Sequence, residues 1–307
     1  MIIGVDHGYA DVKTPNFVFA KSVVSYEKEP PFLNDTVLFG GKYYCCGGER
    51  DTLIKDKTTD DSYYILTLLA IAKELEIRFS GQKSIDEEID LAVGLPIQKF
   101  SSEKDKFIEY LKRPRLLRDV SPVKFAYNKI NFTVRISNVH VYPQGYSAIV
   151  NKLAAIKEPV IICDIGSWTV DVMKLNEKGV PEIGSCISLE YGVSHLLGDI
   201  QKDVFTNHDN SISESLIESV LKGTPNRVSA DIIKTIEAKA QEYTREIRNR
   251  LIKNGFDLDN NRLIYIGGGA NIVSKYSERK IDREDVIGDV RANAIGYELI
   301  TKQKLNG

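Results

Sequence analysis

The sequence has little cysteine, and its four cysteines form no pattern of known chemistry. Cys45 and Cys46 are adjacent, whereas Cys163 and Cys186 lie inside apolar, strand-like runs. Neither arrangement has the spacing of a disulfide framework or of a zinc site. The sequence therefore predicts reduced and mostly buried thiols.

Long hydrophobic runs are also missing. No apolar stretch approaches the ~20 residues that a bilayer-spanning helix needs. The N-terminus passes directly into a strand-like run, without the basic flank and cleavage site of a signal peptide. We therefore expect a cytoplasmic protein with no membrane contact.

Neither sign of charge is in excess. The chain has 41 basic and 43 acidic residues, which gives a formal net charge of −2. No global field favours nucleic acid, so a link to DNA would be local or would pass through a partner protein. The 307 residues are 42% hydrophobic and 27% charged, which is typical of a folded protein of about two domains.

Against this background, one short pattern occurs twice. Residues 3–8 and 161–166 are apolar runs that end in Asp-x-Gly, and a second strand-like run follows each of them. A strand that ends in a carboxylate and turns on a glycine can direct backbone N–H groups to a phosphate and an Asp to a metal ion. Two such hairpins predict a nucleotide held by two related halves.

A third motif follows the apolar strand predicted at 263–266. It ends in three glycines, Gly267, Gly268 and Gly269, where side chains would block a flat ring or a phosphate. A triple glycine is common in flexible loops, but here it lies between a core strand and a helix. The order of the three motifs favours a nucleotide site over three unrelated turns.

The remaining pattern predicts an α/β protein made of two similar halves, with the boundary near Pro159. The halves are 1–158, with a small subdomain at about 17–60, and 159–307, with a helical small subdomain at about 196–261. Further strands are predicted at 89–93, 130–136, 139–141, 160–164 and 183–189. Helices are predicted at about 62–79, 103–112, 145–157, 229–253 and 290–302.

Together the motifs resemble the phosphate and adenosine motifs of the actin/sugar-kinase/heat-shock ATPase superfamily, over essentially the whole chain. Segments 5–9, 94–96, 142–145 and 163–166 are most similar to the bacterial actin-like ParM/StbA plasmid-segregation ATPases. The resemblance implies an actin-like, ribonuclease H-like duplicated fold with a nucleotide cleft between the halves. It also implies ATP or GTP as ligand, together with Mg²⁺.

The resemblance assigns site residues by position. Asp6, Gly8, Tyr9 and Lys13 match the first phosphate loop; Asp164, Gly166, Ser167 and Thr169 match the second; Gly267, Gly268 and Gly269 match the adenosine loop. Asp6 and Asp164 would hold Mg²⁺ through water and form the catalytic set with Gln144. Gln144 would orient the attacking water, since phosphoryl transfer depends mainly on positioning and charge stabilisation. Its alternative role is that of a polar residue at a helix start.

Two residues depart from the family pattern. Tyr9 stands where many relatives have a small hydroxyl residue near the terminal phosphate, and Trp168 stands where glycine or threonine is usual. We interpret Tyr9 as packing on its hairpin and Trp168 as burying its ring between the domains. His7, beside Asp6, leaves a catalytic role open, although a turn imidazole more often makes a local hydrogen bond.

Basic residues also cluster late in the chain, at Arg245, Arg248 and Arg250. They form either a solvated helix face balanced by nearby glutamates or a contact surface. The contact would be with the adenine end of a nucleotide, a neighbouring subunit or an acidic adaptor.

The function implied by the resemblance is an ATPase whose subunits assemble into filaments and move plasmid or mobile-element DNA through a DNA-binding adaptor. No direct contact with nucleic acid is expected. The alternatives are a non-polymerising, nucleotide-gated scaffold and a small-molecule kinase. The kinase is disfavoured because segment 138–145 supplies Gln144 but no carboxylate base.

Overall fold

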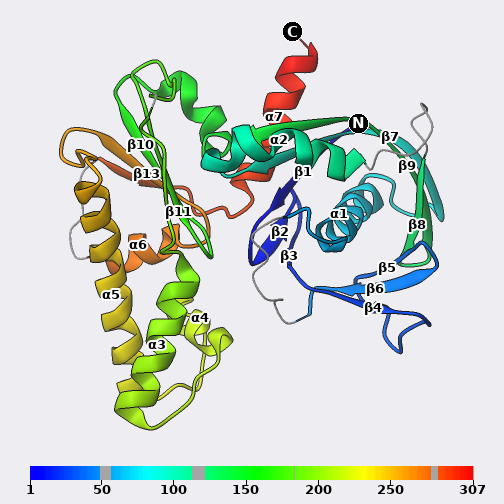
Figure 1. The fold of residues 1–307 in the computed structure, drawn as a ribbon. Coiled ribbons are helices and arrows are strands. Elements are labelled where there is room, and N and C mark those ends of the chain that lie inside the picture. The colour runs from blue at the N-terminus through cyan, green and yellow to red at the C-terminus, as the bar shows by residue number, and fades with distance from the viewer. Residues whose placement is uncertain (49–56, 113–121, 183, 278–282, 307) are drawn as a thin grey trace. The chain divides into compact units, whose positions relative to one another are not determined.

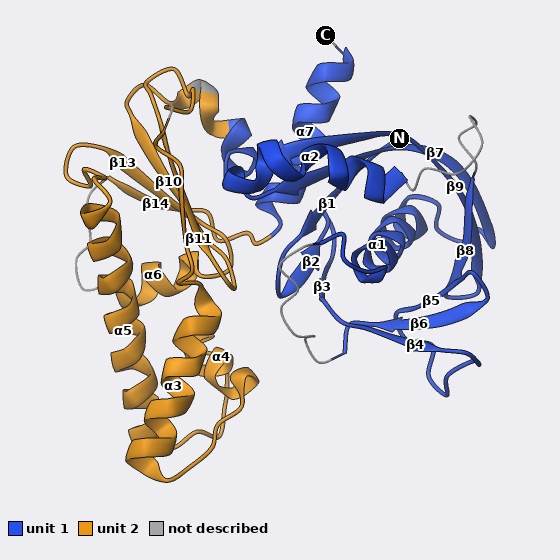
Figure 2. Cartoon of the chain, in the orientation of Figure 1, with its two compact units in different colours: residues 1–151, 291–307 blue, residues 152–290 orange. Residues whose placement is uncertain are grey.

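The computed structural model describes residues 1–48, 57–112, 122–182, 184–277 and 283–306 (Figure 1). The chain forms two compact units, residues 1–151 with 291–307 and residues 152–290 (Figure 2). Residues 49–56 of the predicted first small subdomain, and residue 183 of a predicted strand, lie outside the described residues. Within those residues, no helix combines the length and the apolar character that a membrane span requires.

The first unit is built on a nine-stranded sheet in the order β3-β2-β1-β7-β9-β8-β5-β6-β4. Its strands are β1 (Ile2–His7), β2 (Asp11–Lys13), β3 (Val18–Ala20), β4 (Val23–Tyr26), β5 (Thr36–Phe39), β6 (Lys42–Cys46), β7 (Ser84–Leu95), β8 (Val123–Tyr127) and β9 (Ile130–Pro143). Its helices are α1 (Ser62–Arg78), α2 (Ile97–Lys112), most of the 3₁₀ helix η1 (Ser147–Ala155) and α7 (Ala292–Asn306). The apolar faces of α1 and the sheet form one core.

The second unit has a five-stranded sheet in the order β12-β11-β10-β13-β14. The strands are β10 (Val160–Ile165), β11 (Val170–Leu175), β12 (Ile187–Leu189), β13 (Arg262–Ile266) and β14 (Glu284–Val286). The helices are α3 (Val193–His208), α4 (Glu214–Lys222), α5 (Ala230–Lys253) and α6 (Ala270–Tyr276). A second core joins this sheet to the helices.

The two sheets share one topology. Strands β3-β2-β1-β7-β9 correspond in order and direction to β12-β11-β10-β13-β14: two antiparallel pairings are followed by two parallel ones. The two predicted Asp-x-Gly hairpins, β1–β2 and β10–β11, occupy equivalent positions in this shared topology. The duplicated α/β fold predicted from the sequence is confirmed.

The last helix departs from the predicted limits, because α7 belongs to the first unit and not to the half 159–307. Glu298 on α7 accepts a hydrogen bond from the Gly4 backbone N–H at 3.0 Å and pairs with Arg78 at 3.1 Å. Gly296 lies so close to η1 that a Cβ on it would be 1.9 Å from the carbonyl oxygen of Ser147. The residues that contact α7 are far from it in the sequence, so the local sequence pattern could not assign this helix to the first unit.

Two further elements correct the sequence expectations. The strands predicted at 130–136 and 139–141 form one strand, β9, because pairing with β7 continues along both segments. The helix predicted at 145–157 is a 3₁₀ helix, η1. Gly145, at φ +78°, opens a tight turn, and i→i+3 bonds continue it, such as Ile149 N–H to Tyr146 O at 3.2 Å.

The predicted helix starting at Ser62 is confirmed as α1. The Asp60 side chain accepts a hydrogen bond from the Ser62 backbone N–H at 2.8 Å, which satisfies a donor at the start of the helix. The long basic helix is confirmed as α5, which follows Ser229 and ends before Gly255 at φ +83°.

Candidate functional site

In the first unit, the predicted residues Asp6 and Gln144 meet at one edge of the sheet. Strands β1, β7 and β9 are parallel, so their carboxyl ends lie along the same edge. Gln144 follows β9; its backbone N–H donates to Leu95 O at 2.9 Å and its side-chain Nε2 donates to Asp6 Oδ1 at 2.8 Å. The pairing of the sheet therefore joins two residues that are far apart in sequence.

Lys13 completes this group from the second strand of the hairpin. It lies opposite Asp6 in the β1–β2 register, and its Nζ is 3.6 Å from Asp6 Oδ2. A Cβ on Gly8 would lie 2.6 Å from Asp11 O and 2.7 Å from Lys13 Nζ. Gly8 is thus required by the turn itself, and it lets the lysine lie across the loop.

Tyr9 extends from the same turn into a group of lysines that the sequence analysis missed. Lys57 Nζ lies 5.8 Å from the centroid of the Tyr9 ring. Lys99, in the first turn of α2, hydrogen-bonds the Tyr9 hydroxyl and pairs with Glu103 at 3.2 Å. The only sequence signal was the position of Lys99 just after the motif 94–96; nothing local marked Lys57.

His7 faces the opposite side of β1 and is fully buried. Its Nε2 lies 2.7 Å from Thr67 Oγ1, and the Thr67 hydroxyl donates to Tyr63 O at 2.6 Å. Burial, with a contribution from the Lys57 charge, holds the pKa of His7 well below its usual value. The imidazole is therefore neutral, and it makes a local hydrogen bond inside the core.

In the second unit, the β10–β11 hairpin carries the second predicted loop. Asp164 lies opposite Asp171 across the two strands, and the Gly166 N–H donates to Thr169 O at 2.9 Å to close the turn. The Thr169 hydroxyl donates to Asp171 Oδ2 at 2.9 Å. Asp164 and Gly166 thus lie at the turn of this hairpin, and Thr169 is held by a carboxylate of the same hairpin.

The loop after β10 rests on the N-terminus of α3. The backbone N–H groups of Val193 and Ser194 donate to Gly166 O at 3.0 Å and to Ser167 O at 2.8 Å. A Cβ on Gly192 would lie 2.5 Å from Ser167 O. Because Gly192 has no side chain, it allows this close packing.

The three glycines after β13 have different roles. Gly267 has φ +84°, and a Cβ on it would lie 2.5 Å from Asp164 Oδ1. A Cβ on Gly269 would lie 2.2 Å from Ile165 Cγ2. A Cβ on Gly268 would have no heavy atom within 4 Å. Two of the glycines are therefore required by packing against the second loop, and only Gly268 borders open space.

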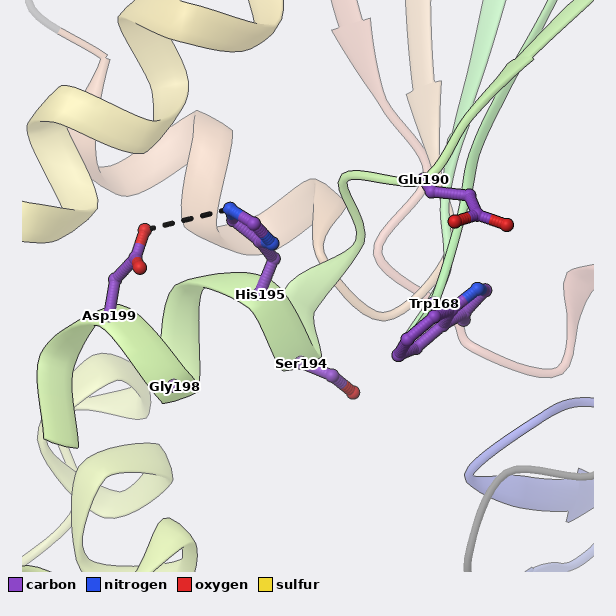
Figure 3. Close-up of a pocket in the computed structure, with 6 residues that line it drawn as sticks. All are labelled: Trp168, Glu190, Ser194, His195, Gly198 and Asp199. Carbon is purple, nitrogen blue, oxygen red and sulfur yellow. Dashed lines mark ion pairs between the residues drawn. The ribbon is translucent and has the colours of Figure 1, made fainter. Parts of the chain in front are cut away.

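Trp168 is half-buried and lines a pocket of about 230 Å³ within the second unit. Figure 3 shows its indole beside Ser194 and Glu190, with His195 next to Ser194 on the first turn of α3 and Asp199 one turn further along. His195 Nε2 lies 3.8 Å from Asp199 Oδ2. The ring thus lies over the start of α3, next to the second loop.

The basic group on α5 is largely neutralised inside its own unit. Arg250 pairs with Glu246 at 3.0 Å, and its guanidinium carbon lies 4.0 Å from the centroid of the Tyr191 ring. Arg248 pairs with Glu284. Arg245 and Arg248 also line a second pocket of about 360 Å³, which contains Asp257 and Asp259. This balance of charges favours a structural role for the arginines.

The donor set fits a magnesium nucleotide. No cluster of three or more metal-ligating side chains occurs in the described part of the chain. Mg²⁺ does not need one, since it retains several waters and binds one or two carboxylates together with substrate phosphates. Taken by itself, the first unit supplies the carboxylate of Asp6 at the end of β1 and the charge of Lys13 for phosphate. The second unit by itself supplies the carboxylate of Asp164 at the end of β10 and open space beside Gly268.

Sequence comparison matches two parts of the chain. Residues 4–146 match the actin-like proteins N-terminal domain, and residues 162–278 match the archaeal actin homologue MreB-like C-terminal domain. No curated protein matches the sequence.

Solved structures match over nearly the whole chain. The archaeal actin homologue Ta0583 in complex with ADP has a TM-score of 0.73 at 18% identity, over 98% of this chain and 99% of that one. The apo pSK41 ParM protein has a TM-score of 0.71 at 16% identity, over 100% and 99%. The Alp12 filament structure has a TM-score of 0.65 at 15% identity, over 99% and 98%. At these identities the likeness establishes the fold. With one hairpin motif in each half and both halves matched, the chain belongs to the family of actin-like proteins.

Proposed function

We propose that this protein is a Mg²⁺-dependent ATPase that assembles into filaments, with subunits released after hydrolysis. The observation that carries the proposal is the group formed by Asp6, Gln144 and Lys13, in which one carboxylate is held by an amide and by an ammonium. The equivalent hairpin of the second unit supplies Asp164. Such a pair of hairpins suits a phosphate chain and its metal ion.

Gln144 is suited to orient a water. Its Nε2 donates to Asp6, so its Oε1 points elsewhere and receives no hydrogen bond from the residues that the structure describes. A fixed amide oxygen can accept a proton of a water and hold it in line with a phosphoryl group. When bound, Mg²⁺ would neutralise phosphate charge beside Asp6 and Asp164.

The relatives support nucleotide binding and assembly. Ta0583 was solved with ADP, and Alp12 was solved as a filament. A head-to-tail interface that does not close produces a filament. By the same likeness to ParM, we propose that the filament acts on plasmid or mobile-element DNA in the cytoplasm through a DNA-binding adaptor. The net charge of −2 suits an indirect link to DNA.

Light scattering and phosphate release, measured together, test this proposal. The purified chain should scatter light after addition of ATP and Mg²⁺, should scatter longer with a non-hydrolysable analogue, and should not scatter with ADP. The same measurements with GTP in place of ATP show which base the protein prefers. If scattering does not depend on nucleotide at micromolar protein concentration, the filament proposal is wrong.

The same measurements separate the alternatives. A nucleotide-gated scaffold would bind ATP, shown by a thermal shift, without scattering. A kinase would release little phosphate until a hydroxyl substrate is added. The kinase remains disfavoured because Gln144, an amide, occupies the position where a carboxylate base is needed.

Replacing Gln144 with alanine should slow phosphate release by about tenfold to a hundredfold, because the water loses its positioning group. ATP affinity should change little, since Lys13 and the loop backbones remain. Scattering with ATP should therefore persist longer in the variant than in the wild type. A variant that hydrolyses ATP at the wild-type rate would remove Gln144 from the mechanism.

A further inference from the structure

Lys57 is a buried lysine that forms no ion pair with any residue the structure describes. Its side chain lies beside the first loop, and the residue is only 4% exposed. Its Nζ is 5.8 Å from the Tyr9 ring centroid, 5.9 Å from that of Tyr63 and 6.0 Å from that of Phe107. Within the described residues it makes no ion pair. Burying an ammonium without an anion is costly, so its retention here calls for a partner.

Lys73 shows what a completed site of this kind looks like in the same unit. Its Nζ also lies among three rings, at 5.4 Å from the Phe17 centroid, 5.6 Å from Tyr127 and 5.9 Å from Phe19. Unlike Lys57, it pairs with a carboxylate, Asp35, at 2.5 Å. The aromatic surroundings of the two lysines match, and only the anion differs.

Among the described residues, the other charges that act on Lys57 already form ion pairs with one another. Lys13 pairs with Asp6, and Lys99 pairs with Glu103. These four groups and Lys57 interact electrostatically, which leaves three positive charges against two negative ones. Burial is the main reason that the pKa of Lys57 falls to about 8, and Asp6 opposes this shift. These five described residues therefore carry one net positive charge, which an incoming anion would neutralise.

Two buried polar atoms near Lys57 lack a hydrogen-bond partner among the residues that the structure describes. They are Tyr63 Oη and His7 Nδ1. The Tyr63 ring lies 6.0 Å from the His7 ring, and the Lys57 ammonium lies over the Tyr63 and Phe107 rings. Unsatisfied polar atoms next to an unneutralised ammonium indicate a place prepared for a polar ligand or its waters.

We infer that Lys57 is a second phosphate-binding lysine, which contacts the terminal phosphate of a bound nucleoside triphosphate and is positioned by the ring of Tyr9. The inference rests on the proposed nucleotide function and extends it to a residue outside the motifs. It also explains Tyr9: an aromatic side chain replaces the small hydroxyl residue of relatives because it holds a lysine. The terminal phosphate then supplies the anion that Asp35 supplies to Lys73.

Binding measurements on three variants test this inference. Lys57→Met keeps the apolar stem without the charge, Lys57→Arg keeps the charge, and Lys73→Met is the matched control from the other aromatic group. Dissociation constants for ADP and for a non-hydrolysable ATP analogue are measured by calorimetry. Lys57→Met should raise the dissociation constant of the analogue by about tenfold to a hundredfold and that of ADP by less than about threefold. The two ligands differ because only the analogue has the terminal phosphate. Lys57→Arg and Lys73→Met should keep the wild-type ratio.

The outcomes separate two failures. If the wild type binds neither ligand, the proposed function itself fails. If the wild type prefers the analogue and Lys57→Met retains that preference, the function stands and Lys57 is only a packed lysine.

Discussion

Replacing Asp6 with asparagine should lower the rate of ATP hydrolysis by about a hundredfold or more, the loss typical of removing a central electrostatic group from a catalytic site. The carboxylate accepts a hydrogen bond from Gln144 and pairs with Lys13, so one substitution disturbs water positioning and charge together. It also removes the charge that would hold the hydrated Mg²⁺ in the first unit.

The measurement is phosphate release at saturating ATP and Mg²⁺, with the melting temperature recorded for each variant. Asparagine has the shape of aspartate and can still accept the bond from Gln144, so the fold should be preserved. Asp231→Asn is the matched control, because Asp231 is exposed on α5 and, among the described residues, its carboxylate pairs with Lys234 alone, at 3.3 Å. A folded Asp6→Asn variant with near wild-type hydrolysis would show that this carboxylate does not serve the reaction.

The second large effect is on stability and distinguishes the glycines after β13. Gly269→Ala should destabilise the second unit by about 1–3 kcal/mol, which is the usual cost of overpacking a core. The new Cβ would lie 2.2 Å from Ile165 Cγ2 and 2.9 Å from Val193 Cγ2. Both neighbours are β-branched, so neither can rotate away easily. Gly267→Ala should also destabilise, because its φ of +84° strains any L side chain.

Gly268→Ala is the matched control for the fold and the test of the site. Its Cβ would meet open space, so the melting temperature should stay close to that of the wild type. Nucleotide affinity should nevertheless fall, since the methyl group enters the space assigned to the adenosine ring. Thermal melts and ADP titrations of all three variants check both statements. A stable Gly269→Ala, or a Gly268→Ala that melts early, would contradict this division of roles.

The candidate site was partly predictable because much of its chemistry is local. Asp6, Gly8 and Lys13 lie within one hairpin, and Asp164 and Gly166 within another, so alternation, a glycine turn and a terminal carboxylate were visible in short windows. The purpose of Gly267 and Gly269 was not visible. We read all three glycines as space for a ligand, whereas the contacts of two of them are with Ile165, Val193 and Asp164.

By itself, the sequence determined the two repeated hairpins, helices α1 and α5, and the duplication of the α/β unit. These follow from periodicity and turn residues, whose physical effects act over a few positions. Only the tertiary structure decided that Gln144 bonds Asp6, that α7 joins the first unit and that Lys57 lies among three rings. Each of these depends on sheet pairing or helix packing between distant segments, and their free energies are set by burial and charge that a local pattern does not contain.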